Sequence, residues 1–137
     1  MFMMVHLPAL LVASLVGFLI GFLWHGPVFG KTWIALMGWT EKDIAAAKAR
    51  PMAGTMALAF VAQVVTAFVL ALLVRVLGLA SVPEALQLAF WAWFGFVAPT
   101  FLNGVLWEGR SINLYLFNLA YYFAVFAAQS LIVTLWQ

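Results

Sequence analysis

Four long apolar stretches, separated by short polar segments, dominate the pattern along the chain. They cover about residues 7–25, 52–77, 83–107 and 112–136. Each reaches the roughly 20 residues that a helix needs to cross a bilayer. The stretches are continuous and do not alternate, which excludes the strands of a membrane barrel. The sequence therefore predicts an all-α integral membrane protein with four transmembrane helices, forming a single domain over residues 1–137.

Composition supports a membrane protein and excludes several other classes. Of 137 residues, 68% are hydrophobic and 7% are charged, whereas soluble domains are about one quarter charged. The net charge of +2 comes with no basic cluster, so nucleic-acid binding is not expected. The expected partners are the lipid bilayer and either a second copy or another membrane protein. The residues before Leu7 include no lysine or arginine, so the first stretch is interpreted as a retained helix and not a signal peptide.

The connections between the stretches set the expected topology. The first connection carries Lys31, Lys42, Lys48 and Arg50, which are four of the six basic residues. Within it, a short interfacial helix is predicted at about residues 41–50, opened by a Thr40–Asp43 capping box, and Ser81–Glu84 predicts a second box. Because basic loops stay inside, we expect the first and third connections to be cytoplasmic and both termini outside, in a bacterial cytoplasmic membrane.

A nine-residue segment occurs twice. Residues 18–26 read FLIGFLWHG and residues 101–109 read FLNGVLWEG, with six of the nine positions identical. The two segments end the first and third apolar stretches, which run in the same direction. The pattern predicts two helix-pair repeats related by an axis along the membrane normal, as in some transporters.

Small residues mark expected helix contacts. Gly17 and Gly21 form a GxxxG pair in the first helix, and Thr100 and Gly104 form a related pair in the third. Such pairs let helix backbones approach closely, within one bundle or between chains. These four residues are predicted to be helix-packing positions.

Polar residues recur at helical spacing inside the other apolar stretches. Gln63 follows Thr55 in the second helix, Asn103 follows Thr100 in the third, and Asn118, Tyr122 and Gln129 share a face of the fourth. Two interpretations remain open. These side chains either bond across helices and fix the packing, or line a polar cavity. The first is favoured because no charged residue lies at mid-membrane, where ion and proton paths usually carry one.

His25 and Glu108 occupy equivalent places in the repeated segment, and Arg110 lies two residues further on. If the two helix pairs are symmetric, His25 and Glu108 approach each other, directly or through one water molecule. A histidine beside a carboxylate can sense pH near neutrality. The alternative is that both residues only anchor helix ends at the membrane surface.

Signatures of catalysis and of cofactor binding are missing from the sequence. Cysteine is absent, the serines have no His/Asp partner pattern, and no glycine-rich phosphate loop occurs. His6 and His25 are too far apart on one helix to bind one haem. No catalytic residue, cofactor or metal ligand is predicted, and the protein is not expected to be an enzyme.

Two segments carry a family resemblance. GFLWHGPVFGKTW at residues 21–33 and APTFLNGVLWEGR at residues 98–110, followed by NLAYY at residues 118–122, resemble the signatures of a family of small membrane proteins catalogued as DUF 1761. The resemblance covers nearly the whole chain. It implies a four-helix membrane fold and no particular activity.

Two functions are therefore expected in competition. The first is a non-catalytic bundle that acts as an accessory, assembly or self-associating membrane subunit. The alternative is an oligomeric channel or carrier for a small solute or ion. A carrier requires a continuous polar cavity containing Gln63, Asn103 and Asn118, whereas the accessory function requires the GxxxG pair to face outward, where another chain can bind.

Overall fold

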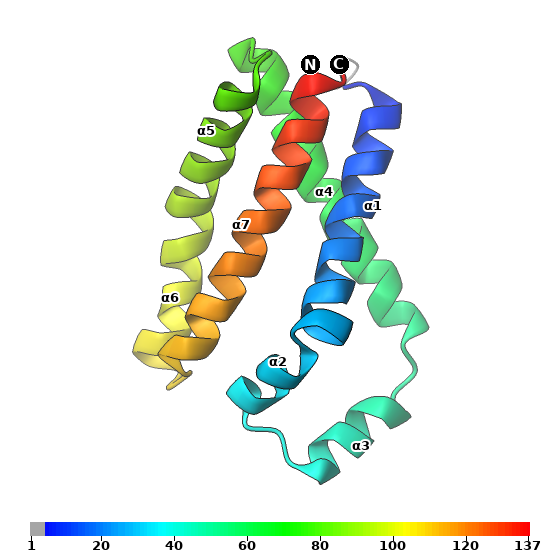
Figure 1. The fold of residues 1–137 in the computed structure, drawn as a ribbon, viewed down its shortest axis with the longest axis vertical. Helices are drawn as coiled ribbons and strands as arrows, with labels where there is room; N and C mark the ends of the chain where they lie inside the picture. Colours follow the sequence, from blue (N-terminus) through cyan, green and yellow to red (C-terminus); the bar gives the residue numbers. More distant parts are fainter. Residues whose placement is uncertain (1–4) are drawn as a thin grey trace.

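Four apolar helical spans form the structure, a computed structural model that describes residues 5–137. The spans are Leu7–Val28, Ala53–Leu77, Val82–Trp107 and Ile112–Leu135, and each is long and apolar enough to cross a membrane. They run alternately in opposite directions, so the start of the first span and the C-terminus lie at one end of the molecule, the terminal end (Figure 1). The first and third connections lie at the other end, which we call the connection end.

Two of the spans are interrupted by π-helical turns. In the first span, α1 (Leu7–Leu23) continues into η2 (Trp24–Val28), which is kinked at Gly26 before Pro27. In the third span, α5 (Val82–Ala92), η3 (Trp93–Val97) and α6 (Ala98–Trp107) follow one another. Proline lacks an N–H and its ring clashes with the carbonyl four residues earlier. Pro99 therefore disturbs the helix at Gly95, inside η3, which a hydrophobicity pattern alone does not reveal.

The first connection contains two helices. The sequence predicts only α3 (Glu41–Ala49), but α2 (Gly30–Met37) precedes it and ends at Gly38, whose φ of 70° closes the helix. The Thr40–Asp43 and Ser81–Glu84 capping boxes are both confirmed, with the reciprocal bonds formed in each. The chain therefore leaves η2 as a helical segment and not as an open loop.

The fourth span, α7 (Ile112–Leu135), lies at the centre of the packing. It contacts α1, α4 (Ala53–Leu77) and α5, and α1 also packs against α4. Among the described residues, α4 makes no comparable contact with α5 or α6. The contacts between the two helix pairs are therefore unequal, and α7 separates α1 from the third span (Figure 1).

The core occupies the half of the molecule nearer the termini. Small residues such as Ala13 and Ala67 are fully buried there, together with Leu70, Val74 and Val133. Their size lets α1, α4 and α7 approach closely. Towards the connection end the start of α4 is exposed, so the helices leave open space between them.

Candidate functional site

A buried polar network joins three helices near the middle of the spans. Gln129 on α7 is fully buried. Its Nε2 donates to the side-chain oxygen of Gln63 on α4 at 3.1 Å and to the carbonyl of Ala13 on α1 at 3.2 Å. Gln63 in turn donates to the hydroxyl of Tyr121 at 3.5 Å. The network ties α1, α4 and α7 together where each is surrounded by apolar side chains.

Gly17 and Gly21 make room for this network. A Cβ atom at Gly17 would overlap with Gln129 Nε2 and Gln63 Oε1, and one at Gly21 would lie 2.8 Å from the Tyr121 hydroxyl. The GxxxG pair therefore faces polar side chains of its own chain. The close approach that the sequence predicts occurs inside the bundle, so the pair does not face outward as the accessory function was expected to require.

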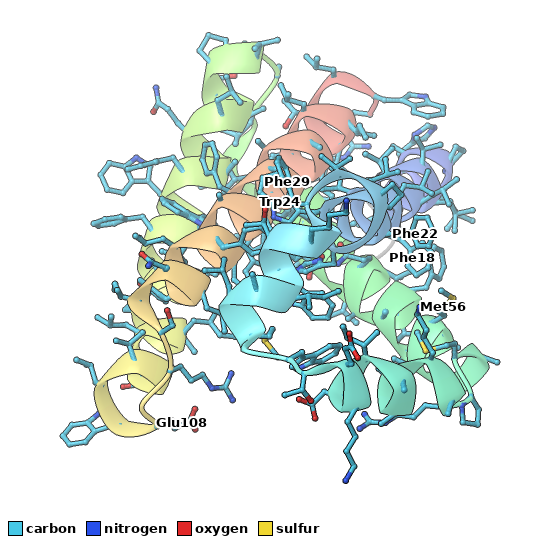
Figure 2. All side chains as sticks on the ribbon, turned by 60° about the horizontal axis from the view of Figure 1, so that its bottom comes forward. Phe18, Phe22, Trp24, Phe29, Met56 and Glu108 are labelled. Atoms are coloured by element: carbon cyan, nitrogen blue, oxygen red, sulfur yellow. The ribbon has the colours of Figure 1, made fainter. Side chains whose placement is uncertain are left out.

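An open groove of about 330 Å³ lies between α1 and α4 at the connection end; we call it the first groove. Its polar lining comes from His25, Thr55, Gln63 and Tyr121. Its apolar walls include Phe18, Phe22 and Met56, which lie near one another in Figure 2.

The first groove reaches deep along the helix. At about 1.5 Å per residue, Gln63 lies roughly 15 Å along α4 from Ala53, which is half of the ~30 Å hydrocarbon thickness. The polar lining thus extends from the connection end to the middle of the span, where it meets the Gln63–Gln129 network.

His25 is held in a fixed orientation at the mouth of the first groove. Its Nδ1 lies 3.1 Å from the carbonyl of Gly21, and since a carbonyl only accepts, Nδ1–H is the donor. The ring packs edge-on against Tyr121 and Trp33, with ring centroids 4.8 and 5.3 Å apart. In the neutral imidazole this arrangement leaves Nε2 as a hydrogen-bond acceptor.

The structure does not bring His25 and Glu108 together. Glu108 ends α6 and pairs with Arg110 at 3.2 Å between Oε2 and Nε, while His25 bonds within its own helix. Neither residue makes a hydrogen bond or ion pair with the other among residues 5–137. The physical reason is the position of α7, which lies between α1 and α6. The expectation of direct contact, which rested on symmetric helix pairs, is therefore not met.

A second groove of about 170 Å³ lies between α6 and α7, also at the connection end. Arg110, Asn118, Tyr122 and Tyr115 supply its polar groups, with the Tyr115 hydroxyl donating to the carbonyl of Ala98 at 2.6 Å. Phe101, Val105 and Leu114 line its apolar part.

The three polar residues that a carrier was expected to share lie apart. Asn118 lines the second groove and Gln63 lines the first. Asn103 lines neither groove, and its amide donates to the carbonyl of Thr100 on the exposed side of α6. The structure therefore shows two separate grooves in place of one continuous cavity. Thr100 itself donates to the Phe96 carbonyl of its own helix.

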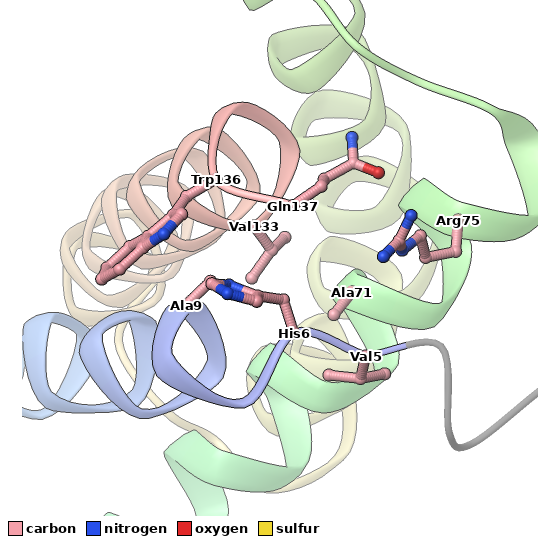
Figure 3. A pocket seen from close by; sticks show the side chains of 8 residues that line it. All are labelled: Val5, His6, Ala9, Ala71, Arg75, Val133, Trp136 and Gln137. Carbon is pink, nitrogen blue, oxygen red and sulfur yellow. The ribbon is translucent and has the colours of Figure 1, made fainter.

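At the terminal end, a cavity of about 10 Å³ lies between His6, Arg75, Trp136 and Gln137 (Figure 3). That volume holds about one water molecule. His6 Nδ1 is buried there with no hydrogen-bond partner among the described residues. The size of this cavity makes it a site for water and not for a larger ligand.

Tyr121 is the site residue that the sequence does not indicate. Its neighbour Tyr122 belongs to the predicted polar face of α7, whereas Tyr121 points to α4 and the first groove. The sequence carries two weak signals for it: Tyr121 belongs to the NLAYY segment of the family resemblance, and Gly17 and Gly21 in α1 imply that something large fills the space opposite.

Comparisons with known proteins identify the family. A search of curated proteins and a search of solved structures each found no match. A family model described as "Protein of unknown function (DUF1761)" matches residues 8–134. That match spans all four helices and both grooves, and the chain therefore belongs to the DUF1761 family.

Proposed function

We propose that the protein is a non-catalytic membrane subunit that binds a small neutral solute or amphiphile in the first groove, in the manner of a carrier. The observation that supports it is the polar lining from His25 to Gln63, which reaches the middle of the span. Polar groups in hydrocarbon are costly unless they bond or meet water. An open groove with such groups suits a ligand that can hydrogen-bond to them.

The chemistry of the lining defines the ligand class. His25, Thr55, Gln63 and Tyr121 offer hydrogen-bond donors and acceptors, and no carboxylate lies among the lining residues. Phe18 and the other apolar walls favour a ligand with an apolar part. We therefore assign binding and no reaction to this groove, and we expect a neutral molecule with a polar head.

The proposed duplication is supported by the residues that line the two grooves. In the repeated segments, Phe18 corresponds to Phe101 and Phe22 corresponds to Val105. The first member of each pair lines the first groove and the second member lines the second groove. Equivalent positions of the first and third spans therefore face equivalent spaces.

The second helix of each pair follows the same rule. Ala59 and Gln63 lie as far from the start of α4 as Asn118 and Tyr122 lie from the start of α7. All four residues line a groove. This supports two helix pairs of common origin, each with one groove at its connection end, although within the second pair only α7 packs closely against the first pair.

We further propose that the connection end faces the cytoplasm of a bacterium, with α3 at the membrane surface. Lys42 and Lys48 on α3 and Arg110 beside the second groove are at this end. Basic residues near helix ends favour the cytoplasmic side. In this topology an alkaline phosphatase fused after Gln137 is active, whereas a fused fluorescent protein that needs the cytoplasm to fold stays dark.

The binding function is tested by filling the first groove. Ala59→Trp places an indole in the groove, while Leu58→Trp places one on the neighbouring position of α4, which is 72% exposed and lines no groove. Each protein is purified in a mild detergent and its bound small molecules are identified by mass spectrometry. We expect one molecule to be retained by the unaltered protein and Leu58→Trp and lost from Ala59→Trp. Equal retention by all three would contradict the proposal.

A second candidate function is that of an accessory, assembly or self-associating subunit. The observation that favours it is a broad aromatic surface on the third span, where Trp91, Phe94 and Phe96 are 63%, 55% and 77% exposed. Aromatic residues are frequent at protein contacts, and the third span packs mainly on α7. Chemical cross-linking in native membranes tests it: a dimer lost in Trp91→Ala supports association, and a monomer in both proteins contradicts it.

A further inference from the structure

Arg110 is held against the second groove by backbone geometry. The backbone N–H of Arg110 donates to the backbone carbonyl of Gly104 at 3.0 Å. Gly109, with φ of 67°, turns the chain back towards α6. A Cβ atom at Gly104 would lie 3.1 Å from Arg110 Cδ. The absence of a side chain at Gly104 therefore lets the arginine lie along α6, where it lines the groove.

Most of the guanidinium group remains available. Glu108 occupies Nε at 3.2 Å, and both side chains are more than 60% exposed. A guanidinium has five N–H donors, so the four on its terminal nitrogens are not taken by the ion pair. Two of these N–H groups can donate to one phosphate at the same time, in the forked geometry that arginine favours. The negative charge of Glu108 opposes anion binding in part, because it lies beside the same group.

The groove next to the arginine combines polar and apolar surface. Asn118 and Tyr122 line it and their side-chain amide and hydroxyl make no hydrogen bond among residues 5–137. The Tyr122 ring stacks on Phe101 with centroids 5.0 Å apart. Val105 extends the apolar wall along α6. Val105 and Leu114 lie two residues from the helix ends beside Arg110, whereas Asn118 and Tyr122 lie roughly 9 and 15 Å along α7 from Ile112. A ligand placed here therefore meets the cation at the membrane boundary and then an apolar wall that carries an amide and, deeper, a hydroxyl.

We propose that the second groove binds one anionic phospholipid from the bilayer. Its phosphate lies on the terminal nitrogens of Arg110, an ester carbonyl accepts from the Asn118 amide, and one acyl chain runs inward along Val105 and Phe101 towards Tyr122. A cation at the mouth of a largely apolar groove selects this occupant, because basic pockets between helices at the cytoplasmic side suit anionic lipid headgroups; this step rests on the cytoplasmic topology proposed above. A free phosphate ion would gain nothing from the apolar wall. This site is distinct from the first groove and does not depend on the function proposed for it.

The proposal is tested by native mass spectrometry of the full chain titrated with phosphatidylglycerol or phosphatidylcholine. We expect one phosphatidylglycerol molecule to bind more tightly than phosphatidylcholine. Arg110→Gln should weaken the affinity for phosphatidylglycerol about tenfold, as the loss of a bond to a charged group implies. The matched control is Arg50→Gln, which removes the same charge from an exposed residue at the same end. Binding should be unchanged in this control.

Two further arms distinguish the alternatives. Val105→Trp fills the groove and leaves Arg110 intact. It should therefore abolish the preference for phosphatidylglycerol over phosphatidylcholine. Added sodium phosphate should not displace the lipid. Equal binding of the two lipids, equal weakening in Arg110→Gln and Arg50→Gln, retention in Val105→Trp, or displacement by phosphate would each overturn the proposal.

Discussion

The side-chain amide of Gln129 donates to the side-chain oxygen of Gln63 at 3.1 Å, across the space that Gly17 leaves open. The bond joins α7 to α4 at the inner end of the first groove. The bond thus links a glycine in the first span, a buried amide in the fourth span, and the polar lining of the groove at Gln63.

Gly17→Ala should destabilise the protein, because the added methyl group overlaps with the amide atoms of both glutamines and displaces a buried hydrogen bond. We expect a loss of about 1–3 kcal/mol in the free energy of unfolding. The control is Gly54→Ala on α4, where a Cβ atom meets nothing within 4 Å. Unfolding in detergent, followed by circular dichroism, measures both. Equal stability of the two variants would contradict the packing described here.

Gln63→Leu and Gln129→Leu should be coupled. Each single change removes the amide–amide bond, so the double variant should lose less stability than the sum of the two. Bonds between membrane helices have coupling energies of about 0.6–2 kcal/mol. A double-mutant cycle in the same unfolding assay gives the value. Strict additivity would show that the bond contributes nothing.

The sequence predicts the four spans well because each one depends only on local hydrophobicity and length. It does not predict the neighbours of each helix. His25 and Glu108 were expected to meet because their segments repeat, yet α7 lies between α1 and α6. Likewise, Gly17 and Gly21 predict a close approach but not its partner. The partners are Gln129 and Tyr121, whose positions depend on how α7 is rotated about its axis.

Asp43 should titrate below its ordinary pKa of 3.8. The backbone N–H of Thr40, and then its hydroxyl, bond to the carboxylate and lower the pKa. Because the pKa is lower in the folded protein, the stability that the ionised Asp43 adds is fully present above pH 3.8. It is lost as the pH falls through the pKa of the folded state. Asp43 is the only aspartate in the chain, so carboxyl-labelled aspartate gives a single NMR signal. Thr40→Ala should raise the pKa of Asp43 part of the way towards 3.8. A measured pKa of 3.8 or higher in the unaltered protein would refute the capping box.

Binding in the first groove requires that water reach the groove from the connection end. The chain has no cysteine, so Ala59→Cys and Leu58→Cys each introduce one thiol at nearly the same depth of α4. In membranes, a charged, water-soluble methanethiosulfonate reagent reacts only with thiols that water reaches. We predict rapid labelling of Ala59→Cys from the connection end and little labelling of Leu58→Cys, which faces lipid. Equally slow labelling of both would show that the groove is closed to water, and would contradict its role as a binding site.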